Sequence, residues 1–308
     1  AVVSSARTLV LVQMNGGNDG LNTVVPDDGR YRDARPTIAI PESDVLRPDG
    51  LDGYGLHPSL AALTRSWDAG RLAIVDAVGF PAPDRSHFVA MDTWWTADDP
   101  TSSDGWLGRA LAGIDGALDP LYAVSLGSGA PVLRGAARRP VEIVRPADFR
   151  FDPDLDVDAF RALGEFESDD ALWAAAAASY GDVADAVAQF ATLTEQDGAE
   201  DDLAPGREGG ATISSGLSTA ASLIAAGGPC RLIVVSGGGF DTHAGQVVTQ
   251  QALLEDLAGG IDGFFTTLEQ SGAADDVLLV AVSEFGRRVA ENASAGTDHG
   301  KGGVAFVA

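Results

Sequence analysis

Apolar segments alternate with polar loops along most of the chain, and their spacing predicts both strands and helices. Short segments that are apolar or rich in β-branched residues predict strands at Thr8–Met14, Arg71–Val78, Leu121–Leu126, Arg231–Val235 and Asp276–Val282. Longer segments predict helices at Pro58–Ala69, Phe88–Ala97, Asp169–Gln196, Thr212–Ala226 and Gln246–Ser271. Apolar strands that alternate with helices indicate an α/β domain in which helices cover both faces of a mostly parallel sheet.

Three segments interrupt this pattern within what we expect to be one domain, residues 1–308. The region 131–158 is irregular and rich in Pro, Arg and Asp, so we expect a small excursion there. The acidic segment Asp197–Gly210 predicts a solvated loop. Lys301–Ala308 resembles the beginning of a strand, so we expect the chain end at Ala308 to be a fragment boundary that cuts into the C-terminal part of the sheet.

Composition narrows the possible classes of protein. The 308 residues are 45% hydrophobic, which is sufficient for a full core, and 45 acidic residues against 20 basic ones give a net charge of −25. This charge repels polyanions and argues against nucleic acid as a partner. Cys230 is the only cysteine and precedes an apolar strand, so we expect it in the core. We find no apolar stretch long enough to be a transmembrane segment.

All four histidines lie in short polar loops, which suggests a shared site. They are His57, His87, His243 and His299, and the loops that carry them contain Gly, Asp, Ser and Thr residues. The polar loops that follow Met14, Val235 and Val282 should lie at the carboxyl edge of the sheet, where α/β proteins bind ligands. We therefore expect the histidines and the acidic residues of these loops to converge.

Carboxylate and imidazole side chains in these loops are candidate metal ligands, namely Asp19, Asp241, His243, Glu284 and His299. Such a set suits Zn²⁺, Mn²⁺ or Fe, and its carboxylates also suit Mg²⁺ or Ca²⁺. Each residue has a structural alternative. Asp19 can stabilise its glycine-rich turn, Asp241 can cap the following helix, and Glu284 can pair with Arg287.

Ser86 and its neighbours are the candidate catalytic groups. Ser86 follows a proline-containing approach and opens a predicted helix, where it serves either as an N-cap or as a nucleophile in the field of the helix dipole. His87 is a candidate metal ligand or general acid/base. Arg85 and Arg287 are candidates for binding a substrate anion through bidentate contacts.

Several motifs, taken in order, resemble the DUF1501 proteins. They are Asn15-Gly-Gly-Asn-Asp-Gly-Leu-Asn22, His57-Pro-Ser-Leu60, Arg85-Ser-His-Phe88, Gly105-Trp-Leu-Gly108, Gly239-Phe-Asp-Thr-His243, Ser283-Glu-Phe-Gly-Arg287 and Gly296-Thr-Asp-His-Gly300. The resemblance covers nearly the whole chain. It implies a protein that is secreted or periplasmic, often exported by the twin-arginine route. It also implies the three-layer α/β/α sandwich of the alkaline phosphatase/sulfatase-like superfamily.

The superfamily resemblance also implies roles for individual residues. Asp19 matches a metal ligand after the first strand, Ser86 the nucleophile, and His299 a late histidine ligand. Asp241 and His243 match an Asp/His ligand pair. The sequence departs from the pattern at Glu284-Phe285, where many members carry Asp-His. A full two-metal site then requires another nitrogen donor, and His87 is the available one.

These expectations favour an exported, metal-dependent hydrolase of phosphate or sulfate esters that acts on a small-molecule or glycan-linked substrate. Ser86 would attack phosphorus or sulfur while a divalent ion polarises the ester. One alternative is a non-catalytic member of the superfamily that binds metal or glycan. A second is an esterase that uses Ser86 and His87 without metal, although adjacent residues rarely reach the required geometry.

Overall fold

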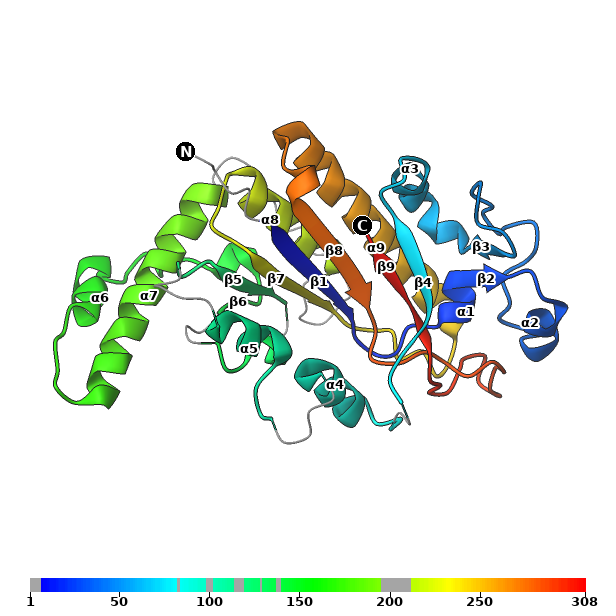
Figure 1. The fold of residues 1–308 in the computed structure, drawn as a ribbon, viewed down its shortest axis with the longest axis horizontal. Helices are drawn as coiled ribbons and strands as arrows, with labels where there is room; N and C mark the ends of the chain where they lie inside the picture. Colours follow the sequence, from blue (N-terminus) through cyan, green and yellow to red (C-terminus); the bar gives the residue numbers. More distant parts are fainter. Residues whose placement is uncertain are drawn as a thin grey trace.

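The computed structural model describes residues 7–81, 84–97, 102–113, 119–127, 129–136, 140–194 and 212–308. At its centre is a seven-stranded sheet with the order β4-β9-β8-β1-β7-β5-β6 (Figure 1). The strands are β1 (Thr8–Met14), β4 (Ala73–Val78), β5 (Ala123–Leu126), β6 (Val141–Ile143), β7 (Leu232–Gly237), β8 (Val277–Val282) and β9 (Gly303–Val307). Only β9 runs antiparallel to its neighbours, which confirms the predicted α/β architecture with a mostly parallel sheet.

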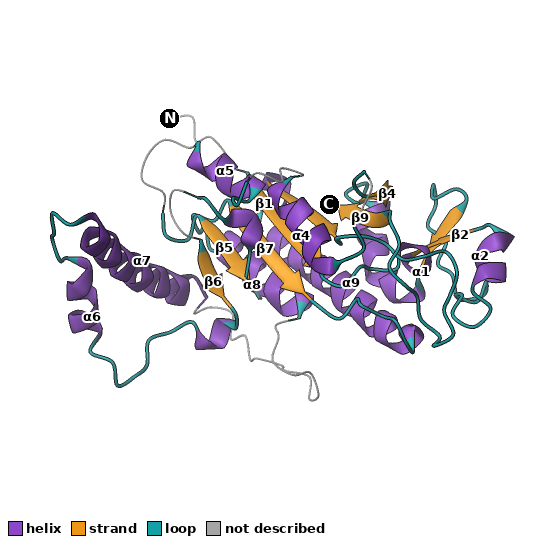
Figure 2. Ribbon diagram, turned by 90° about the horizontal axis from the view of Figure 1, so that it is seen from below, coloured by secondary structure: helices purple, strands orange, loops and turns teal. Residues whose placement is uncertain are grey.

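Helices cover both faces of this sheet, as Figure 2 shows. One face packs against α8 (Ile213–Ala225) and α9 (Gln246–Ser271), and the other against α4 (His87–Thr96) and α5 (Trp106–Ala112). The alternation of side chains along β1 explains the two layers. Val10, Val12 and Met14 are fully buried in the larger core, whereas Leu11 belongs to a smaller cluster with residues of α5.

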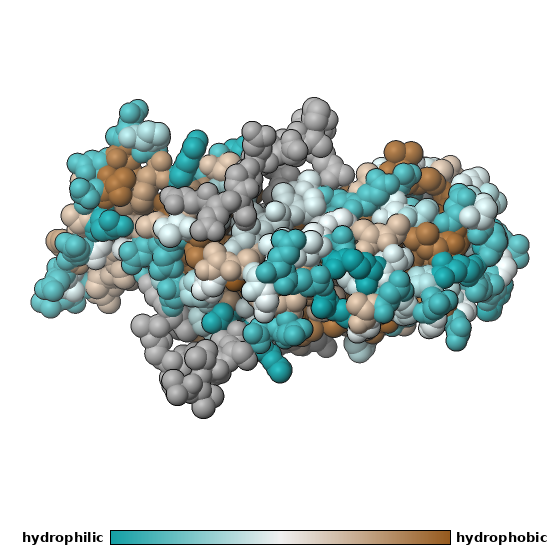
Figure 3. All heavy atoms as spheres, turned by 90° about the horizontal axis from the view of Figure 1, so that it is seen from above, coloured by the Kyte–Doolittle hydropathy of each residue, from teal (hydrophilic) through white to brown (hydrophobic). Residues whose placement is uncertain are grey.

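Smaller elements extend from both ends of the sheet. At one end lie α1 (Gly20–Thr23), α2 (Gly29–Ala34), α3 (Thr64–Asp68) and the two-stranded antiparallel sheet of β2 (Val24–Pro26) and β3 (Tyr54–Leu56). At the other end α6 (Val157–Gly164) and α7 (Ala171–Thr194) pack against each other and project from the body (Figures 1 and 2). This projecting end, on the left in Figure 3, carries exposed apolar side chains, among them Phe166, Leu172 and Trp173.

Most predicted elements are present, with shifted boundaries. The helix Gln246–Ser271 has the predicted bounds, but Pro58–Ala69 divides into a 3₁₀ segment, Pro58–Leu63, followed by α3. The region 131–158, predicted to be irregular, contains β6 and two short 3₁₀ turns. Lys301–Ala308 contributes β9, as its sequence indicated, whereas the acidic loop Asp197–Gly210 lies outside the described residues.

The expected position of the single cysteine is also confirmed. Cys230 is buried in the larger core, and burial raises the pKa of its thiol to about 12. None of the helices in the described part of the chain combines the length and apolarity needed to cross a membrane.

Candidate functional site

The candidate site lies where three loops meet the beginning of α4. Because β1, β7 and β8 are parallel neighbours, their carboxyl ends point to one edge of the sheet, at the lower right in Figure 1. The loops that leave this edge carry most of the predicted site residues, as the sequence indicated. Glycine permits the close approach of two of the loops: a Cβ on Gly16, which has a φ of 120°, would lie 2.4 Å from the Asp241 backbone nitrogen.

Asp241 is at the centre of a cluster of three histidines. Its Oδ1 lies 3.1 Å from His243 Nε2, 3.1 Å from His299 Nε2 and 3.3 Å from His87 Nε2. The Nε2 atoms of His243 and His299 are 2.8 Å apart. The four side chains retain between 19% and 47% of their exposure, so solvent and small molecules can reach the cluster.

The opposite ring nitrogen of each histidine faces an acceptor. His87 Nδ1 lies 2.7 Å from Glu284 Oε1, His299 Nδ1 lies 2.7 Å from the Arg85 carbonyl oxygen, and His243 Nδ1 lies 3.5 Å from Asp298 Oδ1. A carbonyl oxygen only accepts, so His299 donates from Nδ1 and a neutral ring then carries its lone pair on Nε2. The same tautomer suits His87, whose Nε2 is buried and has no hydrogen-bond partner.

Arg287 holds the loops of the site together. Its side chain is fully buried and donates to the carbonyl oxygens of Gly16, Gly17, Phe240 and Thr297, and to Asp241 Oδ1 at 2.6 Å. The guanidinium predicted to bind a substrate anion is thus occupied by protein oxygens. Burial by itself would raise the pKa of Asp241, but the hydrogen bond and the positive charge of Arg287 outweigh it and lower this pKa to about 2.

Asp19 belongs to a different, buried network. Both of its oxygens accept from Arg35, at 2.5 and 2.9 Å, and Oδ2 also accepts from Gln246. Asp19 is 1% exposed and Arg35 is fully buried. Arg35 precedes Pro36 and ends α2, so the chain turns there and directs this side chain inward. Of the predicted metal ligands, Asp19 is therefore the one that the structure separates from the histidines.

The remaining predicted residues lie around the cluster or apart from it. Glu284 is 5% exposed and contacts His87 Nδ1 and the Gly16 N–H, so it supports a histidine instead of meeting Asp241. Ser86 is the N-cap of α4, and its hydroxyl makes no capping hydrogen bond. His57 lies elsewhere, buried at the start of a 3₁₀ segment, where its Nδ1 accepts from the Ser59 N–H.

Two groups that support the cluster were not predicted. The Arg85 carbonyl and the Asp298 carboxylate each face a histidine Nδ1. Asp298 directly precedes His299 in the sequence, which gave a signal for a further carboxylate at this edge. A backbone carbonyl gives no such signal.

The donors of the cluster fit a metal ion. One donor atom each from His87, Asp241 and His299 lie within 4.8 Å of one another, and His243 Nε2 is adjacent. Imidazole Nε2 atoms whose Nδ1 is held by a carboxylate or a carbonyl are the usual arrangement around Zn²⁺. Three nitrogens and one carboxylate suit zinc better than Mg²⁺ or Ca²⁺, which prefer oxygen.

The fold and this cluster together define an α/β protein with a histidine–aspartate site at the carboxyl edge of its sheet. Residues 56–308 match DUF1501, a family described as proteins of unknown function, and the chain belongs to this family. No curated protein matches the sequence.

Proposed function

We propose that this protein is a metal-dependent hydrolase of phosphate or sulfate esters, with an alkaline phosphatase-like fold and one zinc ion at the histidine cluster. The ligands would be the Nε2 atoms of His87, His243 and His299 together with the Asp241 carboxylate. The observation that carries the proposal is the meeting of these electron-pair donors within 2.8–3.3 Å. Lone pairs so close together repel one another unless a proton or a metal cation lies between them, and a divalent cation can serve all four donors at once.

The charges around the cluster also favour a cation. Asp241, Glu284 and Asp298 contribute three carboxyl groups, whereas two guanidinium groups face them: Arg287 contacts Asp241, and Arg288 lies 3.7 Å from Asp298. A divalent ion held at this position supplies electrophilic stabilisation for negative charge that develops on an ester oxygen. Its binding would satisfy the buried His87 Nε2, which has no hydrogen-bond partner in the protein.

Ser86 is the proposed nucleophile. It lies between Arg85, whose carbonyl contacts His299, and His87, which contacts Asp241, so its backbone is part of the site. Its side chain is half-buried at the beginning of the ten-residue helix α4 and makes no capping bond. Ser86 Oγ would bond to phosphorus or sulfur as the alcohol leaves, with the serine proton passing through solvent to that alcohol. Water would then cleave the seryl ester.

Metal content tests the first part of this proposal. The purified chain should bind about one zinc ion, removable by a chelator, and His299→Asn should lower the affinity by at least about 100-fold. His57→Asn is the matched control because this histidine lies outside the cluster. Equal zinc binding by the two variants would contradict a site at the cluster.

Ester hydrolysis tests the second part. Against aryl phosphates and aryl sulfates, Ser86→Ala should lower activity by at least about 1,000-fold while metal content and melting temperature stay unchanged. Ser59→Ala, at the start of another helical segment, is the matched control. A fully active Ser86→Ala variant would remove the nucleophile from the proposal.

A non-catalytic, metal-binding protein is the second candidate function. The engagement of Asp19 with Arg35 favours it, because the resemblance to the phosphatases assigns a metal ligand to that position. Zinc binding at the cluster without hydrolysis of any phosphate or sulfate ester would establish this candidate instead. Export from the cytoplasm is part of our proposal and is supported only by the resemblance to exported proteins.

A further inference from the structure

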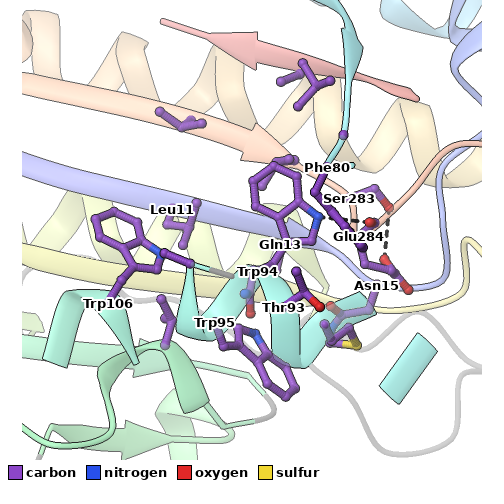
Figure 4. A pocket seen from close by; sticks show the side chains of 18 of the residues that line it. Leu11, Gln13, Asn15, Phe80, Thr93, Trp94, Trp95, Trp106, Ser283 and Glu284 are labelled. Carbon is purple, nitrogen blue, oxygen red and sulfur yellow. Dashed lines mark hydrogen bonds between the residues drawn. The ribbon is translucent and has the colours of Figure 1, made fainter. Parts of the chain in front are cut away.

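A cavity of about 470 Å³ lies next to the histidine cluster, between the sheet and α4 (Figure 4). Its floor is the face of β1 and β8 opposite to the larger core, and its walls carry the rings of Phe80, Trp94, Trp95 and Trp106. The volume lies within the range of pockets that bind small molecules, about 300–1,000 Å³. The cavity is therefore of the size for a small ligand and too small for a folded partner segment.

The lining of the cavity changes from one end to the other. Leu11 and Trp106 lie at one end in Figure 4, whereas Asn15, Ser283 and Glu284 lie together at the other. An amphiphilic molecule, apolar at one end and polar at the other, matches this distribution.

Glu284 joins the polar end of the cavity to the candidate metal centre. It lines the cavity, and its Oε1 lies 2.7 Å from His87 Nδ1. The Glu284 backbone carbonyl accepts from the Trp94 indole at 2.9 Å, which fixes an aromatic wall of the cavity to the same residue. A ligand in the cavity and a group at the histidine cluster would thus both lie next to Glu284.

We propose that this cavity binds the apolar group, aryl or short alkyl, of the ester that is cleaved at the histidine cluster. The inference rests on the proposed function and adds the class of its substrate. The Glu284 carboxyl at the polar end and the net charge of −25 repel anions, so a neutral group occupies the cavity. The anionic phosphate or sulfate is then directed to the cation site.

The experiment measures binding of non-hydrolysable monoester mimics to the zinc-loaded chain by calorimetry. In the series from methyl- to hexylphosphonate, Kd should fall about fourfold for each added methylene until the cavity is filled. The three tryptophans provide a second signal, because a ligand among them should change their fluorescence. A Kd that does not depend on chain length would overturn the proposal.

A pair of variants on one strand locates the binding. Val280 lines the cavity, whereas Leu278, two residues earlier on the same face of β8, is exposed and lies outside it. Val280→Phe should remove the dependence on chain length, and Leu278→Phe should behave like the wild type. Met91→Trp fills the cavity from α4 and replaces Val280→Phe if that variant fails to fold. Equal chain-length dependence in the filled and control variants would overturn the assignment.

An uncharged probe separates this inference from the proposed function. Binding of 2-naphthol should quench tryptophan fluorescence and should be weakened at least about tenfold by Val280→Phe, with or without zinc. If this holds while no ester is hydrolysed, the cavity is a ligand site and the hydrolase proposal fails. If hydrolysis occurs but neither naphthol nor chain length has an effect, the cavity inference fails alone.

Discussion

Asp19 and Asp241 follow parallel strands at the same edge of the sheet, yet their surroundings differ. Asp19 is 1% exposed, and its oxygens are bound by the guanidinium of Arg35 and the amide of Gln246. Asp241 also contacts an arginine, but its side chain is 47% exposed and faces three histidine nitrogens. The first carboxylate is satisfied within the protein, whereas the second faces the imidazole nitrogens on which the proposed zinc site rests.

This difference shows that position at a sheet edge does not by itself assign a ligand. The partner that packs against the carboxylate decides its role. A buried guanidinium supplies donors in a fixed geometry and neutralises the charge, which leaves little reason for a metal to bind. Imidazoles held through Nδ1 instead present lone pairs, which leaves a site for a cation.

The largest effect should come from breaking the buried ion pair. Asp19→Ala should lower the free energy of unfolding by about 3–5 kcal/mol, because it leaves the Arg35 charge buried without a counterion. Urea denaturation measures this loss. Asp27→Ala, which removes an exposed partner of Arg47, should cost less than about 1 kcal/mol. A stable Asp19→Ala chain that has lost zinc binding would instead place Asp19 in the metal site.

At the histidine cluster, we expect the main change in zinc binding and not in the free energy of unfolding. Asp241→Asn should weaken zinc binding by at least about 100-fold, because the ligand loses its charge, while an amide oxygen remains for Arg287. Competition with a chelator of known affinity measures the change. Asp262→Asn, on the exposed face of α9, should bind zinc like the wild type. Unchanged zinc binding by Asp241→Asn would remove this residue from the ligand set.

The buried His57 should make the stability of the folded chain depend on pH. Burial lowers the pKa of His57 to about 4 from its ordinary value of 6.5. Below pH 6.5 the unfolded chain takes up a proton that the folded chain refuses, so this contribution to stability is complete above pH 6.5 and is lost as the pH falls towards 4. Between pH 7 and 4.5 the loss should be about 2.5 kcal/mol.

His57→Asn isolates this contribution because asparagine keeps an acceptor for the Ser59 N–H but does not titrate. Urea denaturation at the two pH values should show a smaller loss of stability in the variant than in the wild type. The three histidines of the cluster are present in both proteins, so their titration cancels. Equal losses would mean that His57 is protonated in the folded chain.

The smallest effect is expected for Glu284, which contacts a proposed ligand of the ion and not the ion itself. Glu284→Gln keeps an acceptor for His87 Nδ1 but removes the negative charge, so zinc affinity should fall by about tenfold. The chelator competition resolves such a change. Glu255→Gln, an exposed substitution of the same kind on α9, is the control. A loss as large as that of Asp241→Asn would indicate that Glu284 is itself a ligand.

The architecture was predictable where the sequence shows a clear apolar or helical pattern. The strands β1, β7 and β8 are short and apolar, and α9 lies between glycines at positions 245 and 272 that end its helical pattern on both sides. β6 has only three residues, Val141–Ile143, which are too few to show a period. It joins the sheet because its backbone pairs with β5.

The site was predictable in part, for the same physical reason. Parallel pairing brings the loops after β1, β7 and β8 to one edge, so the convergence of Asp241, His243 and His299 followed from the strand pattern. The burial of Arg35 against Asp19 did not, because it depends on how α2 packs. For His57, the adjacent Pro58 and the start of a helical segment were available signals of its capping role.

The central position of β1 has a consequence for how the chain acquires its structure. Both neighbours of β1 in the sheet come late in the sequence, since Leu9 pairs with Leu232 on one side and with Leu278 on the other. During synthesis this apolar strand has no sheet partner until the chain beyond Leu232 has emerged. Such non-local pairing slows folding and exposes intermediates to aggregation. A nascent chain of this protein is therefore a candidate client for chaperones that shield unpaired apolar strands.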